Sequence, residues 1–132
     1  MKAPSGCLVY TTSQNQAKIE QLQALGATVV VMPNAAGKVD LAAMLRDLAQ
    51  RGSNELHVEA GFKLNGSLIR EGLVDEFLFY QAPKLLGTGA MGIANFGPLD
   101  ALSQGLQLEF QDVARLGPDL RIVARVQGRS SF

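Results

Sequence analysis

The segment from His57 to Ser67 holds the residues best placed to do chemistry. An apolar run that carries one carboxylate, Glu59, leads through two small residues into a helical pattern. If the run is a strand, ligands are expected at its carboxyl end, and free N–H groups at the start of the next helix favour phosphate. Ala60 and Gly61 have little side chain to keep a pyrophosphate from the backbone. Glu59 can accept hydrogen bonds from a ligand hydroxyl or amine.

Two familiar phosphate motifs do not fit this segment. Gly61 and Gly66 have the spacing of a P-loop, but Ser67 stands where the lysine of that motif belongs. The segment also lacks the Gly-x-Gly-x-x-Gly pattern of dinucleotide-binding turns. A glycine turn that only joins a strand to a helix is the competing interpretation of the spacing.

His57 and Cys7 are the only histidine and cysteine in the chain. His57 is two residues from Glu59, and side chains two apart in a strand share a face. A nucleophile mechanism would also need a thiol or hydroxyl on a sharp turn, whereas Cys7 is predicted within a buried strand. We therefore expect a structural or partly exposed His57 and no catalytic side-chain nucleophile. One cysteine and one histidine also cannot supply the ligands of a typical zinc site, which excludes a zinc-dependent deaminase.

The elements that must position this segment alternate between two hydrophobic periods. Short apolar runs bounded by turn residues predict three buried strands, at 7–10, 28–32 and 56–59. Helical spacing predicts three helices: one capped by Ser13 and ended by Gly26, one capped by Asp40 and ended by Gly52, and one from Phe62 to near Gly72. Strand and helix units in succession imply parallel strands with right-handed crossovers.

The last third of the chain predicts antiparallel strands. A strand at 77–80 leads into a glycine-rich loop, Gly87 to Gly97, which is interpreted either as a ligand lid or as an ordered connection. Apolar residues then alternate over 106–111 and 120–126, the pattern of a hairpin. The whole predicts an α/β fold with a mixed, mainly parallel sheet flanked by helices and a C-terminal antiparallel hairpin.

The charges are unevenly distributed along the second half of the chain. Acids outnumber bases six to one between residues 71 and 112, and bases outnumber acids four to one from residue 113 onward. We expect Arg121 and Arg125 to pair across strands with acids such as Glu109. A surface for an anionic ligand or partner is the alternative.

The overall composition describes a single domain over residues 1–132. The chain is 47% hydrophobic, and its twelve basic and twelve acidic side chains cancel. Zero net charge gives no general reason to bind nucleic acid or an anionic membrane. No apolar stretch approaches the roughly 18 residues of a membrane span, and the first residues do not begin a signal peptide, so we expect a cytoplasmic protein.

A set of short motifs in a fixed order gives the chain a family resemblance. The motifs are Val58-Glu-Ala-Gly61, Leu64, Gly72-Leu-Val-Asp-Glu76, Tyr80-Gln-Ala-Pro83, Leu86-Gly87 and Leu116-Gly-Pro-Asp-Leu120. Together they resemble the reductase domain of the bifunctional riboflavin biosynthesis deaminase/reductase, from about Leu8 to Val126. The resemblance implies a dihydrofolate-reductase-like fold and a homodimer.

The resemblance also implies a reaction and a set of site residues. NADPH would transfer a hydride to the ribosyl carbon of a phosphoribosylamino-pyrimidinedione and open the sugar to the ribityl form. Glu59 matches the acid that contacts the substrate. The turn and helix start that hold the cofactor phosphates match Gly61, Phe62, Lys63, Leu64, Asn65, Gly66 and Ser67.

The chain departs from the family pattern at two points. Ala60 replaces the first of two glycines found after the acid in many members. The family's first strand, its substrate-phosphate loops and its deaminase domain are not matched, so we expect a C-terminal part with little turnover alone. Two other functions stay open: a non-catalytic oligomerisation module that pairs through an exposed sheet edge, and a related dihydrofolate-reductase-like enzyme with another substrate.

Overall fold

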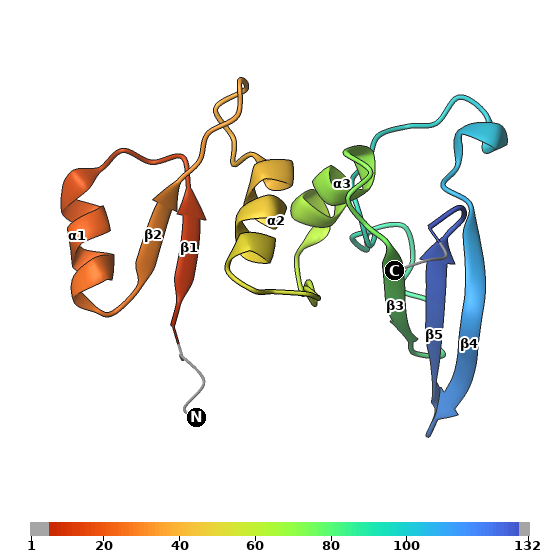
Figure 1. Ribbon diagram of the computed structural model, residues 1–132. Helices are drawn as coiled ribbons and strands as arrows, with labels where there is room; N and C mark the ends of the chain where they lie inside the picture. The colour runs from red at the N-terminus through yellow and green to blue at the C-terminus, as the bar shows by residue number, and fades with distance from the viewer. Residues whose placement is uncertain (1–5, 130–132) are drawn as a thin grey trace. The chain divides into compact units, whose positions relative to one another are not determined.

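The strands of the chain form two separate sheets, one in each of two units. The computed structural model describes residues 6–129, and its units comprise Met1–His57 and Val58–Phe132 (Figure 1). The expected α/β class, with parallel strands, helices and a C-terminal antiparallel hairpin, is confirmed. The parallel part is a two-stranded sheet and the antiparallel part a three-stranded one, in place of the single mixed sheet that we expected.

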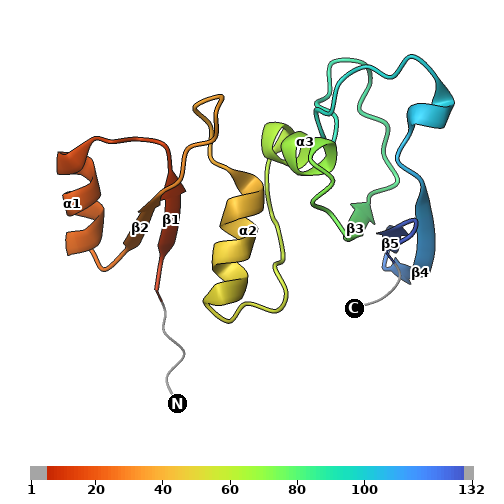
Figure 2. The same ribbon diagram turned by 45° about the horizontal axis from the view of Figure 1, so that its top comes forward.

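The first unit has a pair of parallel strands with one helix on each side (Figures 1 and 2). Its elements are β1 (Leu8–Thr11), α1 (Gln16–Ala24), β2 (Thr28–Val31) and α2 (Leu41–Gln50). In the register of this pair, Leu8 lies opposite Thr28 and Thr11 opposite Val31. The prediction that both strands are buried was wrong: Val31 is 42% exposed and Cys7 lies exposed before β1. Within residues 6–129 the two strands pair only with each other, so no further strand covers their outer edges.

The two helices of this unit begin at side-chain caps. Asp40 caps α2 as predicted, since its Oδ1 accepts a hydrogen bond from the Ala43 N–H at 2.8 Å. The cap of α1 is Asn15 in place of the predicted Ser13, with Oδ1 accepting from the Lys18 N–H at 3.1 Å. Ser13 Oγ instead accepts from the Asn15 N–H and so shapes the turn before the helix. Gly26 follows α1 at a φ of +88°, which ends the helix as predicted.

A hydrogen-bonded group ties α2 to β1. The Tyr10 hydroxyl donates to Asp47 Oδ2 at 2.5 Å, and Arg51 Nε donates to the same oxygen at 2.7 Å. Arg51, and after it Tyr10, lowers the pKa of the Asp47 carboxyl, while burial and then the Asp47 hydrogen bond raise the pKa of Tyr10. The three side chains thus favour an ionised Asp47 beside a neutral tyrosine.

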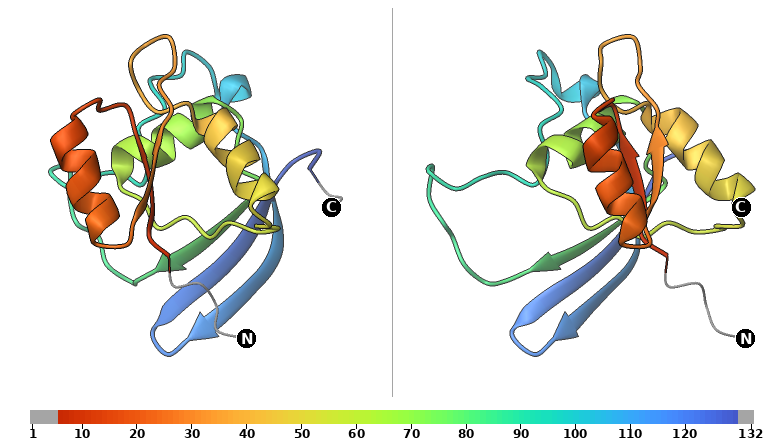
Figure 3. Two further views of the ribbon diagram at one scale, coloured as in Figure 1. Left: turned by 60° about the vertical axis from the view of Figure 1, so that its left-hand side comes forward. Right: turned by 90° about the vertical axis from the view of Figure 1, so that its left-hand side faces the viewer.

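The second unit joins one helix to an antiparallel sheet. Its elements are α3 (Phe62–Arg70), β3 (Glu76–Gln81), a short 3₁₀ helix η1 (Leu102–Gln104), β4 (Leu108–Leu116) and β5 (Asp119–Val126). The strand order is β3-β5-β4, and the long β4–β5 hairpin is visible in Figure 3. Gly117 has a φ of +59° in the two-residue loop, which suits the right-handed twist of a hairpin. The predicted hairpin is therefore confirmed.

The prediction of a strand at 56–59 was wrong. These residues have no regular secondary structure, and Leu56 and Val58 are 44% and 43% exposed. An apolar run becomes a strand only when the backbone of another segment hydrogen-bonds to it. Within residues 6–129, no strand pairs with this run.

Ion pairs cross the second sheet. Arg121 contacts Asp112 at 2.5 Å, and Arg125 Nε contacts Glu76 at 3.0 Å. Cross-strand pairing of both arginines is confirmed; Glu76 is the register partner of Arg125 on β3, and Glu109 is its register partner on β4. Arg129 donates to Asp75 Oδ1 at 2.7 Å and to the backbone oxygens of Val74 and Gly72, and so fixes the turn between α3 and β3.

Few side chains are fully buried in the described part of the chain. Leu41, Leu68 and Ala124 are the buried apolar residues, and Ala124 lies in the central strand β5. None of the helices within residues 6–129 is long and apolar enough to cross a membrane.

Candidate functional site

The amino end of α3 leaves backbone donors without helical partners. Gly61 is the N-cap residue, with extended dihedral angles (φ −86°, ψ 173°) and no side-chain cap. The first bond of the helix runs from the Asn65 N–H to Gly61 O at 3.1 Å. The earlier N–H groups of a helix have no acceptor within it, and together with the helix dipole they attract anions.

A hollow of about 440 Å³ opens at this end of the helix. Gly61, Phe62, Lys63 and Leu64 line it, together with Met91 from the glycine-rich loop. Lys63 is exposed, and a Cβ added at Gly61 would meet no atom within 4 Å, so the backbone there is open to a ligand. Leu64 and Met91 add exposed apolar surface. The hollow thus combines positive charge with apolar walls, a combination that suits a phosphate-bearing ligand with a planar or apolar part.

Residues 91–96, which we call the strap, lie against α3 (Figure 2). The Asn95 N–H donates to Phe62 O at 2.9 Å, and the Arg70 guanidinium donates to Asn95 O. Asn65 Nδ2 donates both to Ile93 O at 3.0 Å and to Ala60 O at 3.2 Å. This half of the loop is therefore an ordered connection, and through Met91 it also borders the hollow.

A glycine lets the strap approach the helix. Gly66 is buried, and a Cβ at this position would overlap the carbonyl group of Asn95 and lie 2.7 Å from its nitrogen. Any residue other than glycine would therefore displace the strap or the helix.

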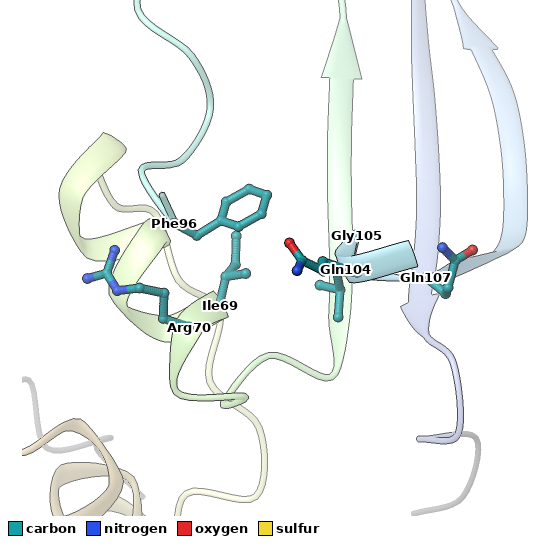
Figure 4. Close-up of a pocket in the computed structure, with 7 residues that line it drawn as sticks. Ile69, Arg70, Phe96, Gln104, Gly105 and Gln107 are labelled. Carbon is teal, nitrogen blue, oxygen red and sulfur yellow. The ribbon is translucent and has the colours of Figure 1, made fainter. Parts of the chain in front are cut away.

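A second hollow, of about 320 Å³, lies near the carboxyl end of α3 (Figure 4). Its lining comprises Ile69, Arg70, Phe96, Gln104, Gly105, Leu106 and Gln107. Figure 4 shows Phe96 beside Ile69, with Arg70 pointing away from them. The Arg70 guanidinium bonds to Asn95 O and Ser67 Oγ, and Gln104 Oε1 accepts from the Asp100 N–H. Because Arg70 and Gln104 hold the loop, this hollow offers little chemistry.

The structure separates the predicted site residues into two groups. Gly61, Phe62, Lys63 and Leu64 line the first hollow. Asn65, Gly66 and Ser67 do not; Asn65 and Gly66 contact the strap, and Ser67 Oγ donates to Lys63 O at 3.2 Å.

Glu59 is exposed in the irregular segment before α3. His57 is exposed as well and belongs to the first unit. Because this segment is not a strand, the alternation of side chains along a strand does not place His57 and Glu59 on one face.

Sequence analysis placed three residues of the strap, Met91, Ile93 and Asn95, in a loop that is either a lid or a connection, but it did not identify their contacts with α3. These contacts are distant in sequence, and the local signal was only the glycine-rich composition of the loop. Among residues 6–129, no group of three or more His, Cys, Asp or Glu side chains could hold a metal ion.

Comparison with known proteins decides the family. The model of the RibD C-terminal domain matches residues 2–122. The chain belongs to the RibD C-terminal domain family. This confirms the resemblance stated from the motifs. RibD of Escherichia coli is 37% identical over 91 residues, which cover 69% of this chain and 25% of that protein.

Two further relatives support the family and the fold. The 5-amino-6-(5-phosphoribosylamino)uracil reductase of Buchnera aphidicola is 34% identical over 86 residues, 65% of this chain and 42% of that protein. The solved structure of Acinetobacter baumannii RibD has a TM-score of 0.77 and 26% identity, and the match covers 91% of this chain and 31% of that one. The dihydrofolate-reductase-like fold expected for a RibD C-terminal domain is confirmed. The chain spans between a quarter and a half of the length of these curated relatives.

Proposed function

We propose that this chain is the cofactor-binding part of an NADPH-dependent 5-amino-6-(5-phosphoribosylamino)uracil reductase that forms the ribitylamino product of riboflavin biosynthesis. The family and the printed name of the Buchnera relative support this reaction. The observation that carries it is the hollow at the amino end of α3, where Lys63 and backbone donors meet apolar side chains. We also propose that the protein acts in the cytoplasm.

The donor set of the hollow fits a nicotinamide dinucleotide. Backbone N–H groups and the Lys63 ammonium would hold phosphate oxygens, and the open backbone at Gly61 lets them approach. Leu64 and Met91 would contact apolar parts of the cofactor. The bound cofactor would supply the hydride.

The residues of this chain would bind and orient both reactants. Glu59 would accept hydrogen bonds from a substrate hydroxyl or amine, because it is exposed and stands two residues before the cap of α3. Holding the ribosyl carbon and the hydride donor in one geometry is the main contribution such a site can make. No side-chain nucleophile is needed.

Calorimetric titration of NADPH into the chain tests this function. We expect one molecule of NADPH to bind per chain, more weakly at higher ionic strength because salt screens Lys63 and the phosphates from each other. The variant Lys63→Met should bind NADPH more weakly, and its affinity for NADPH should depend less on the salt concentration. A chain that is folded yet binds no NADPH would contradict the proposal.

A second candidate function is oligomerisation through the sheet of the second unit. Within residues 6–129, β3 and β4 each pair with β5 alone, and Leu78, Tyr80 and Leu116 are each more than 40% exposed on one face. Unpaired edges and exposed apolar side chains favour a second copy of the chain. We therefore propose that the reductase is a homodimer.

Sedimentation with and without NADPH separates the two candidates. We expect a dimer in both conditions, because the sheet lies apart from the residues that line the hollow. A monomer in both conditions would overturn the dimer. A dimer without affinity for NADPH would favour the oligomerisation module over the reductase.

A further inference from the structure

We infer that Asn65 is a positioning residue for the cofactor site: its side-chain amide holds the strap against the turn before α3 and so sets the shape of the hollow. The inference rests on the proposed function. Asn65 Nδ2 donates to Ala60 O at 3.2 Å and to Ile93 O at 3.0 Å. A single amide thus joins the turn on one side of the hollow to the strap on the other.

This geometry gives Asn65 a different role from its neighbours in the helix. An asparagine amide has two N–H donors, and two backbone oxygens occupy the donors of Asn65. The amide oxygen of Asn65, Oδ1, is a hydrogen-bond acceptor and cannot bind a phosphate oxygen. Asn65 is half-buried, whereas Lys63 and Leu64 are exposed in the hollow. The family resemblance placed all three in the turn and helix start that hold the cofactor phosphates.

The position of the bond along the strap explains why it matters. Asn95 is held separately, by Phe62 O and by Arg70. Asn65 donates a hydrogen bond to the carbonyl oxygen of Ile93. Ile93 is two residues from Met91, which lines the hollow. Loss of the Asn65 amide should therefore loosen residues 91–94 while Asn95 stays attached to the helix.

The experiment combines NMR relaxation of the free chain with NADPH titration. In Asn65→Leu, which keeps the size of the side chain but has no donor, we expect lower backbone order parameters at residues 91–94. If the strap is then in place about a tenth of the time, the Kd for NADPH should rise about tenfold. Asn65→Gln keeps the amide and should restore part of both effects. Glu71→Gln, at the opposite end of α3, should change neither.

Each outcome decides a separate point. Unchanged order parameters of residues 91–94 in Asn65→Leu would overturn the clamp itself. Lower order parameters with an unaltered Kd would overturn its role in cofactor binding. If Asn65→Leu does not fold, the partial effects in Asn65→Gln give the same decision. If the unsubstituted chain binds no NADPH, the proposed function fails, and the relaxation data still show whether Asn65 holds the strap.

Discussion

Gly66→Ala is expected to lower the thermal unfolding midpoint of the chain, although alanine is the better helix former. Position 66 lies within α3, where helix propensity alone would make the variant about 1 kcal/mol more stable. The new methyl group would overlap the Asn95 carbonyl, which belongs to the backbone and cannot rotate away as a side chain can. Overpacking of this kind costs about 1–3 kcal/mol, and an overlap with backbone atoms belongs at the upper end, so the net loss after the helix-propensity gain should be about 2 kcal/mol, or about 6 °C for a chain of this size.

The control for this prediction is another glycine of the same unit. A Cβ added at Gly89 would meet nothing within 4 Å, and its φ is outside the left-handed region. Gly89→Ala should therefore shift the midpoint by about 1 °C or less. Calorimetry or circular dichroism on both variants provides the measurement. A Gly66→Ala chain more stable than the unsubstituted one would show that the strap does not lie against the helix.

Gly61→Asp is expected to abolish most NADPH binding while leaving the fold intact. Aspartate is a favoured N-cap residue, and its carboxylate would accept the N–H groups of Lys63 or Leu64. The variant should thus be as stable as the unsubstituted chain or a few tenths of a kcal/mol more stable. The same carboxylate would occupy donors meant for a phosphate and repel it. Like charges at about 4 Å cost about 1–4 kcal/mol, so affinity should fall at least about fivefold.

An uncharged variant at the same position separates the two effects. Gly61→Asn caps the helix with a side chain of the same shape, so it should compete for the same donors without repelling the phosphate. We expect its NADPH affinity, measured by calorimetric titration, to lie between those of the unsubstituted chain and Gly61→Asp. Equal affinity in all three proteins would place the phosphates away from α3.

The parts of the fold that could be predicted are those fixed by nearby residues. Asp40 and Gly26 mark helix ends through their own hydrogen bonds and dihedral angles. The β4–β5 hairpin follows from the alternation of its strands and from a glycine at its turn. The run at 56–59 looks like a buried strand in the same way, but a strand also needs a partner backbone, which no pattern within the run can provide.

In the candidate site, too, the features with a local signal were predicted and those that depend on distant contacts were not. The turn and helix start at Gly61 were predicted, because small residues before a helical pattern are a local signal. The bond from Asn65 to Ile93 was not, because it depends on how a loop without hydrophobic periodicity returns to α3. In the sequence alone, an asparagine that holds a loop looks the same as one that binds a ligand.

The Tyr10–Asp47 hydrogen bond gives the chain an internal optical reporter. The chain has no tryptophan and two tyrosines, with Tyr10 in the first unit and Tyr80 in the second. The Tyr10 hydroxyl donates to a carboxylate, an arrangement that quenches tyrosine emission, whereas Tyr80 is 63% exposed on β3. Fluorescence of Tyr80→Phe and Tyr10→Phe chains would therefore follow the first and the second unit separately as each one unfolds.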